Sequence, residues 1–157
     1  MNFADIVVWG FAATIVLTTI LRAGQALAFT RIDLPFIIGS LLTPDRDLAK
    51  VYGSLIHIVN GWLFAFVYAA AFQASGTAGL PFGMLVGFVH GTFVTVVAMP
   101  LLPIFHPRMA SEAWGPDPTR QLEPPGNFAM NYGPSTPVLT LVAHVVYGGI
   151  LGFFYGF

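Results

Sequence analysis

Four long segments of the chain are almost entirely apolar, and the charged residues are concentrated in the connections between them. A membrane-spanning helix needs about 20 consecutive, mostly apolar residues. Four segments meet this requirement, at about residues 6–29, 51–73, 79–105 and 137–157. The pattern predicts an all-α fold, a four-helix transmembrane bundle that forms one integral membrane domain over residues 1–157.

Charged side chains are rare, and this sets the class of protein. They make up 8% of the 157 residues, against roughly 25% in an ordinary soluble domain. So few charges cannot cover the surface of a soluble protein, so we expect an integral membrane protein in contact with the lipid bilayer. The net charge of −1 provides no basic excess for nucleic acid. The absence of cysteine excludes disulfides, zinc ribbons, iron–sulfur clusters and thiolate nucleophiles.

The positive charges predict how the helices are oriented. All six Lys and Arg residues lie in, or just before, the first and third connections. In a four-span protein these two connections lie on the same side, and the positive-inside rule places them in the cytoplasm. Both termini are then expected on the outer side of the membrane. Arg22, near the end of the first span, is expected at the cytoplasmic face, where it can snorkel or pair with an Asp of the first connection.

Both charged connections contain a further feature. Residues 34–42 are apolar but too few to span a membrane, which predicts a short interfacial or re-entrant segment. The third connection, about residues 106–136, is rich in Pro and Gly and unusually long. It predicts a structured cytoplasmic loop before the fourth helix. His106 and Arg108, where this loop begins, are typical of a helix end with a basic anchor at the membrane interface.

The second and fourth spans carry the same pattern. His, Val, Gly, a small residue, Phe and Tyr recur at identical offsets in residues 57–68 and 144–155. This internal repeat predicts two tandem helical hairpins that run in the same direction. Small residues repeated on one helix face allow two helices to approach closely in a membrane. The expected packing residues are Gly61, Ala65, Tyr68, Gly148, Gly152 and Tyr155, with Gly83 and Gly87 in the third span.

Three histidines lie on these faces within the spans: His57, His90 and His144. We expect them in a polar, close-packed interior together with Asn60. Such histidines are compatible with axial ligation of a haem or of a (bacterio)chlorophyll, with a transition metal bound by imidazoles, or with a proton relay. They are also compatible with plain helix contacts, in which each imidazole donates to a carbonyl or hydroxyl. The sequence leaves these alternatives open.

Several short segments of the sequence, taken together, resemble those of a group of membrane proteins. They are Leu34-Pro35-Phe-Ile-Ile-Gly39, Thr43-Pro44-Asp45-Arg46, His57 with Gly61 and Tyr68, His106-Pro107-Arg108-Met109, Pro125-Gly126, and His144-Val-Val-Tyr147-Gly148 with Gly152 and Tyr155. Together they resemble an uncharacterised family of small four-span bacterial membrane proteins. The resemblance covers nearly the whole chain. It implies the fold and a location in the bacterial inner membrane, and it implies no activity. In that membrane, the orientation expected from the positive charges puts both termini on the periplasmic side.

Two functions fit these features. The chain has no hydrolase triad, phosphate loop or intramembrane carboxylate pair, so catalysis is not expected. We therefore favour a non-catalytic membrane subunit or scaffold that associates with itself or with other membrane subunits, in which the histidines could hold a haem, pigment or metal. The alternative is a small oligomeric transporter or channel for a proton, a metal ion or a small solute. A metal-dependent membrane enzyme ranks third.

Overall fold

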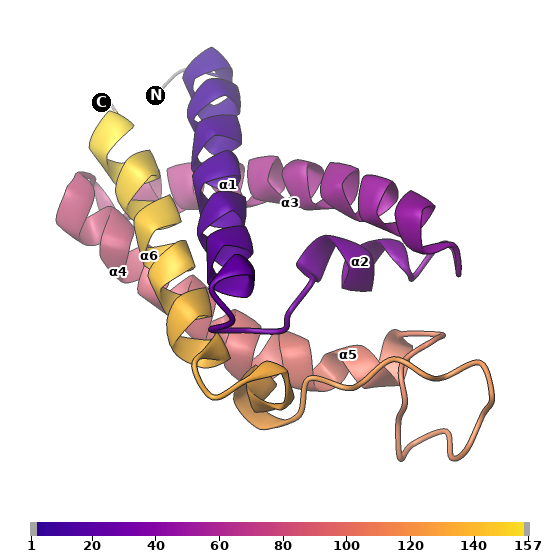
Figure 1. Cartoon of the computed structure of the whole chain (residues 1–157). Helices are drawn as coiled ribbons and strands as arrows, with labels where there is room; N and C mark the ends of the chain where they lie inside the picture. The colour runs from indigo at the N-terminus through magenta and orange to yellow at the C-terminus, as the bar shows by residue number, and fades with distance from the viewer. Residues whose placement is uncertain (1–2, 156–157) are drawn as a thin grey trace.

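The computed structural model describes residues 3–155 and is built from helices, with no strand among those residues (Figure 1). In chain order the helices are α1 (Phe3–Ala26), α2 (Leu34–Gly39), α3 (Arg46–Ser75), α4 (Leu80–Phe93), the π-helix η1 (Val94–Ala98), α5 (Met99–Phe105), the 3-10 helix η2 (Asn127–Tyr132) and α6 (Thr136–Phe154). Four helices are long and apolar enough to cross a membrane, namely α1, α3, the continuous α4–η1–α5, and α6. The predicted all-α fold with four long apolar helices is confirmed. The predicted last span ran to residue 157, and residues 156–157 lie outside the described part.

The helices begin and end a few residues from the predicted positions. α1 stops three residues early, because Ala28 adopts a left-handed conformation (φ 59°) and the Phe29 N–H donates to the Gly24 carbonyl. α3 begins at Arg46, earlier than predicted, because the Asp45 carboxylate accepts the first free N–H groups of the helix at 3.0 and 2.8 Å. Hydropathy alone detects neither of these helix-capping arrangements.

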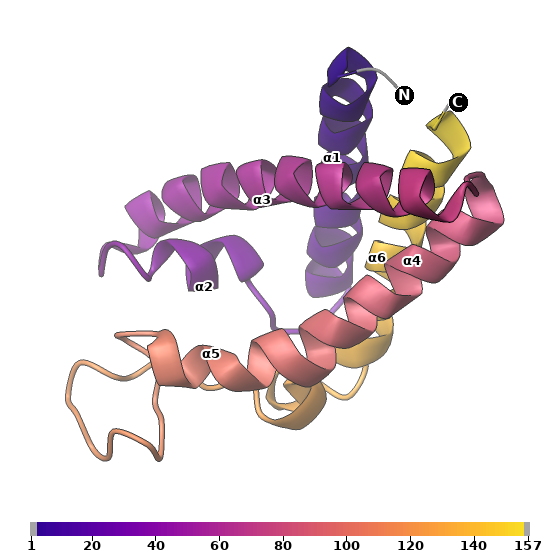
Figure 2. The ribbon, with the colours of Figure 1, turned by 180° about the vertical axis from the view of Figure 1, so that it is seen from behind.

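The long helices pack in crossing and parallel pairs. α1 contacts both α3 and α6, and α4 packs along α6. Figures 1 and 2 show that α3 crosses α1. The beginning of α1 and the end of α6 lie at the same end of the molecule (Figure 1), where the rings of Trp9 and Phe154 stack with their centroids 3.5 Å apart.

Glycines bring the backbones of α4 and α6 into direct contact. A methyl group added at Gly83 of α4 would lie 2.9 Å from the Cα atom of Gly152, and one added at Gly148 of α6 would lie 2.9 Å from the Cα atom of Gly87. Carbon atoms in contact normally lie about 3.5–4.0 Å apart. No side chain therefore fits between these faces, as expected for small residues spaced four apart in a membrane.

α3 and α4 diverge from their shared turn at residues 76–79 and form a wedge (Figure 2). Aromatic rings fill its narrow end, where Phe72 packs against Phe82 with centroids 5.9 Å apart and Phe64 stacks on His90 at 4.0 Å. The short helix α2 lies at the wide end, between α3 and α5 (Figures 1 and 2). α1 and α6 lie behind the wedge, so its middle is enclosed from several sides.

The apolar segment at residues 34–42 forms α2, which packs tightly on the first half of α3. A methyl group added at Gly39 of α2 would overlap the carbonyl of Ala49, and one at Gly53 of α3 would overlap the carbonyl of Pro35. The Asp33 carboxylate caps α2 by accepting the N–H of its third residue at 3.3 Å. These contacts hold α2 as a fixed wall of the wedge.

The two charged connections meet at one end of the molecule. Arg31 of the first connection forms an ion pair with Glu123 of the third at 3.1 Å, and the Arg31 N–H donates to the Tyr132 carbonyl at 2.6 Å. Arg22 forms an ion pair with Asp33 at 3.3 Å. The expected pairing of Arg22 with an Asp of the first connection is confirmed.

Candidate functional site

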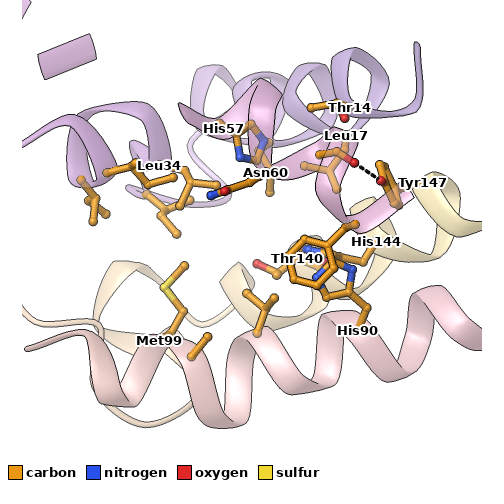
Figure 3. Close-up of a pocket in the computed structure, with 18 of the residues that line it drawn as sticks. Thr14, Leu17, Leu34, His57, Asn60, His90, Met99, Thr140, His144 and Tyr147 are labelled. Carbon is orange, nitrogen blue, oxygen red and sulfur yellow. Dashed lines mark hydrogen bonds between the residues drawn. The ribbon is translucent and has the colours of Figure 1, made fainter. Parts of the chain in front are cut away.

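A cavity of about 240 Å³ occupies the middle of the wedge (Figure 3). Most of the side chains that line it are apolar, and its polar lining residues are Thr14, His57, Asn60, His90, Thr140, His144 and Tyr147. The expectation of a close-packed interior around the histidines is therefore wrong. The cavity exists because α3 and α4 diverge, while the η1 residues that face it, Val94 and Ala98, are too small to fill the space.

The α1 side of the cavity is fixed by hydrogen bonds to backbone carbonyls. The buried Thr14 hydroxyl donates to the Gly10 carbonyl at 2.6 Å, and the Tyr147 hydroxyl donates to the Gly61 carbonyl at 2.6 Å (Figure 3). Gly61 faces Thr14 so closely that it has no space for a side chain, and Ala65 lies one turn further along the same contact with α1. These groups are satisfied within the protein and serve as structural walls.

His144 and His90 form one edge of the cavity. Their rings are in contact, with centroids 4.7 Å apart and planes at 78°. The His144 Nδ1 atom lies 2.8 Å from the Thr140 carbonyl, which only accepts, so the proton of the neutral ring is on Nδ1 and its Nε2 is an acceptor. The His90 Nδ1 atom lies 3.1 Å from the Tyr68 hydroxyl. With Tyr68 donating, His90 carries its proton on Nε2.

His57 enters the cavity from α3, on the opposite wall (Figure 3). Its Nε2 atom is buried and has no hydrogen-bond partner among the described residues, and it alone of the buried side-chain polar atoms there lacks one. Asn60, one turn further along α3, is exposed at the open side of the wedge and lines the same cavity. It is the fifteenth of the thirty residues of α3 and thus its midpoint. A polar amide at that depth is costly when it faces only hydrocarbon.

The residues present do not fit a haem, a chlorophyll-type pigment or a three-histidine metal site. The rings of His90 and His144 are in direct contact, so these two histidines cannot be the axial ligands on opposite faces of one haem. The cavity is also smaller than the roughly 300 Å³ at which pockets for drug-sized ligands begin. Among residues 3–155, no three His, Cys, Asp or Glu side chains come together as metal ligands.

The repeat brings equivalent positions to the same cavity. Asn60 and Tyr147 each follow the histidine of their helix by three residues, and both line the cavity. The repeat tyrosines lie outside it, where Tyr68 is buried and contacts His90, and the Tyr155 hydroxyl donates to the Ala69 carbonyl at 3.4 Å. Sequence reasoning overlooked Tyr147, although the repeat alignment with Asn60 pointed to it.

A second, much smaller space lies beside the cavity and is lined in part by Arg22. It measures about 10 Å³, about the least that can hold one water molecule. His57 and Leu21 line both spaces, and Arg22 lines the smaller one. His57 therefore lies between the cavity and the ion pair that Arg22 forms with Asp33.

His106 and Arg108 hold α2 in place instead of facing solvent. The fully buried His106 ring has its Nε2 atom 3.0 Å from the Ile37 carbonyl, and its Nδ1 accepts the Arg108 N–H at 3.1 Å. The Arg108 guanidinium also donates to the Ser40 carbonyl. Burial lowers the pKa of His106, and nearby Arg108 and Arg120 lower it further, against the opposing effect of the Ile37 carbonyl.

No known protein family, curated protein or solved structure matches this chain. The fold and the site alone therefore define the class of protein. It is an all-helical protein with four helices suited to cross a membrane, built around a cavity that three histidines share.

Proposed function

We propose that this protein is a non-catalytic integral membrane subunit that holds a small organic ligand in the cavity between α3 and α4. The single observation that carries this proposal is the buried, unpartnered Nε2 atom of His57 at an open cavity. A buried polar atom without a partner costs about 1–3 kcal/mol. A bound molecule removes that cost once the His57 ring turns toward the cavity and forms a hydrogen bond with it.

The residues that line the cavity favour binding a ligand over catalysing a reaction. Among the described residues that line it there is no carboxylate, lysine or serine, so no strong nucleophile or charged acid–base pair faces the space. The polar groups are imidazoles, hydroxyls and an amide. These groups orient a neutral ligand through hydrogen bonds, and the apolar remainder binds its hydrocarbon part.

The proposal includes a topology and an assembly. Both charged connections lie in the cytoplasm, the termini lie on the periplasmic side of a bacterial inner membrane, and the two hairpins descend from one tandem repeat. The support is the charge distribution and the contact between the two charged connections. Exposed Asn60 at the midpoint of α3 favours association with other membrane subunits or with a second copy.

The test is chemical analysis of the protein extracted with its native lipids in polymer nanodiscs. Absorption spectra, metal analysis and mass spectrometry of an organic extract are expected to reveal one small organic molecule per chain. His57→Leu should lose the molecule, whereas Ser54→Ala should retain it. Ser54 is the matched control because it lies on the same helix, outside the cavity, and donates to the Lys50 carbonyl at 2.7 Å. A wild-type extract with no specific molecule beyond membrane lipids contradicts the proposal.

The small space between the cavity and Arg22 favours a second candidate, a small oligomeric transporter. One water molecule in that space would connect the cavity to the face that carries Arg22. A transporter requires solute or proton flux in proteoliposomes that His57→Leu abolishes and Ser54→Ala leaves intact. Absence of flux from wild-type protein that still holds its ligand excludes this candidate.

A further inference from the structure

The volume of the cavity sets the size of the ligand. An apolar cavity of about 150 Å³ is large enough to bind benzene. A cavity of about 240 Å³ therefore has room for one six-membered ring with a few small substituents. Phe64, stacked on His90 at the cavity wall, provides an aromatic surface for such a ring.

The polar edge of the cavity sets the functional group on the ring. The Nε2 atom of His144 is an acceptor, because the proton of the neutral ring is on Nδ1, which donates it in a hydrogen bond to the Thr140 carbonyl. His90 offers a donor at Nε2 when Tyr68 donates to its Nδ1. Because the two rings are in contact, we expect the Nε2 atoms of both histidines to hydrogen-bond to the same oxygen atom of a ligand. A hydroxyl group both donates and accepts, whereas a ketone or an ether only accepts.

The open side of the wedge sets the route of entry. Asn60 of α3 and Ala98 of η1 both line the cavity and are both exposed. They lie on elements that diverge from each other (Figure 2). Because both residues are exposed and line the cavity, we place its opening between these two apolar helices. A ligand that enters there comes from the hydrocarbon of the bilayer, and a hydrocarbon tail on its ring can remain in the lipid.

We infer that the ligand is a lipid-soluble phenol or quinol, whose ring hydroxyl bonds to His144 and His90 and whose tail leaves between α3 and η1. This inference rests on the proposed function and specifies the ligand class of the same site. It predicts discrimination between molecules of equal size that differ only at the ring oxygen. A probe without the hydroxyl proton cannot donate to the His144 Nε2 atom, and the loss of this hydrogen bond weakens binding about tenfold or more.

The experiment compares three probes: 4-decylphenol, 4-decylanisole and decylbenzene. The chain has no cysteine, so Ala98→Cys introduces one thiol at the open side of the cavity. The full-length variant in nanodiscs made from synthetic phosphatidylcholine is titrated with each probe, and the rate of thiol labelling by a membrane-permeant maleimide is measured. Thr77→Cys, in the exposed turn between α3 and α4, is the control for effects of the probes on the membrane.

We expect 4-decylphenol to protect the thiol of the Ala98→Cys variant at a concentration at least tenfold lower than the other two probes, with no protection at the Thr77→Cys position. Adding His144→Phe should abolish the tenfold preference. If that double variant fails to fold, Ala98→Phe provides a second test, because it fills the open side without removing a hydrogen-bonding group. That variant should bind radiolabelled 4-decylphenol at least tenfold more weakly than wild type.

Equal protection by all three probes overturns the ligand class, although the cavity would still hold a molecule as proposed. Lack of protection by every probe also overturns the ligand class. In that case the proposed function is decided separately by the molecule found, or not found, in the native extract.

Discussion

The contact between α4 and α6 predicts that the same substitution destabilises the protein much more at one of two adjacent glycines than at the other. Gly148→Ala places a methyl group 2.9 Å from the Gly87 Cα atom and even closer to the Gly83 carbonyl. Gly149→Ala places it 3.1 Å from the Cδ1 atom of Leu80 and 3.2 Å from the Cγ atom of Met84, and both of these side chains can rotate aside whereas a backbone cannot. Both variants gain the same helix propensity, so the difference between them reports the backbone contact.

The size of the effect follows from the distance the helices must move. Carbon atoms in contact need about 3.5 Å, so Gly148→Ala separates α4 from α6 by at least about 0.6 Å. A gap of that size forfeits roughly a quarter to a half of each atom-pair attraction of about 0.15 kcal/mol. Over roughly 40 atom pairs at the interface the loss is about 2 kcal/mol, and in lipid no hydrophobic term compensates for it.

The assay is the free energy of unfolding in mixed micelles, measured by titration with a denaturing detergent and followed by circular dichroism. We expect Gly148→Ala to be less stable than Gly149→Ala by about 2 kcal/mol. The Gly148→Ala variant should also lose bound ligand, because α4 carries His90 and α6 carries His144 at the same interface. A difference below about 0.5 kcal/mol would refute the close approach of the two backbones.

Three further predictions follow from other contacts. Because burial and nearby cations lower the pKa of His106, the folded protein resists protonation there. The contribution of His106 to the free energy of unfolding should be fully present above about pH 6.5, the ordinary pKa of histidine, and should decrease as the pH falls from there toward the lowered pKa. Unfolding titrations at several pH values should therefore show a weaker acid dependence for His106→Gln than for wild type. Gly53→Ala should displace α2 and expose the wide end of the wedge, seen as faster proteolysis or hydrogen exchange of α2, and protection equal to wild type would contradict the tight packing. With both termini outside, an impermeant maleimide applied to intact cells should label Thr77→Cys and spare Glu112→Cys, and the reverse pattern would invert the proposed topology.

The sequence predicted the features that depend on regular spacing. The four apolar lengths are visible without knowledge of contacts. The spacing of four between Gly83 and Gly87, and between Gly148 and Gly152, indicates a helix face that admits a second backbone. The ion pair of Arg22 could likewise be anticipated, because a charge near a span end needs a local partner.

Other features depend on how distant segments meet, which spacing does not encode. The close approach of Gly39 and Gly53 involves a short helix and the first turns of a long one, so neither glycine belongs to a visible repeat. His106 is buried because α2 folds over it, which no local pattern near His106 indicates. The π-helix η1 differs from these features because it has a local cause. Pro100 lacks an N–H and disfavours a regular α-helical turn just before it.

The cavity was missed for a different reason. A repeat of small residues suggests uniform close packing, yet the same glycines draw α4 toward α6 and away from α3. The side chains on η1 are too small to fill the resulting space. The histidines were thus found from the sequence, whereas the empty volume beside them follows only from the divergence of two helices.

Native mass spectrometry of the intact protein, released from its own membrane, shows directly whether the cavity holds one small molecule. We expect a major species heavier than the bare chain by the mass of a single ligand with one ring. This species should be absent from Ala98→Trp, in which the open side of the cavity is filled. A wild-type spectrum that contains only the bare chain and the same bound lipids as Ala98→Trp would contradict this expectation.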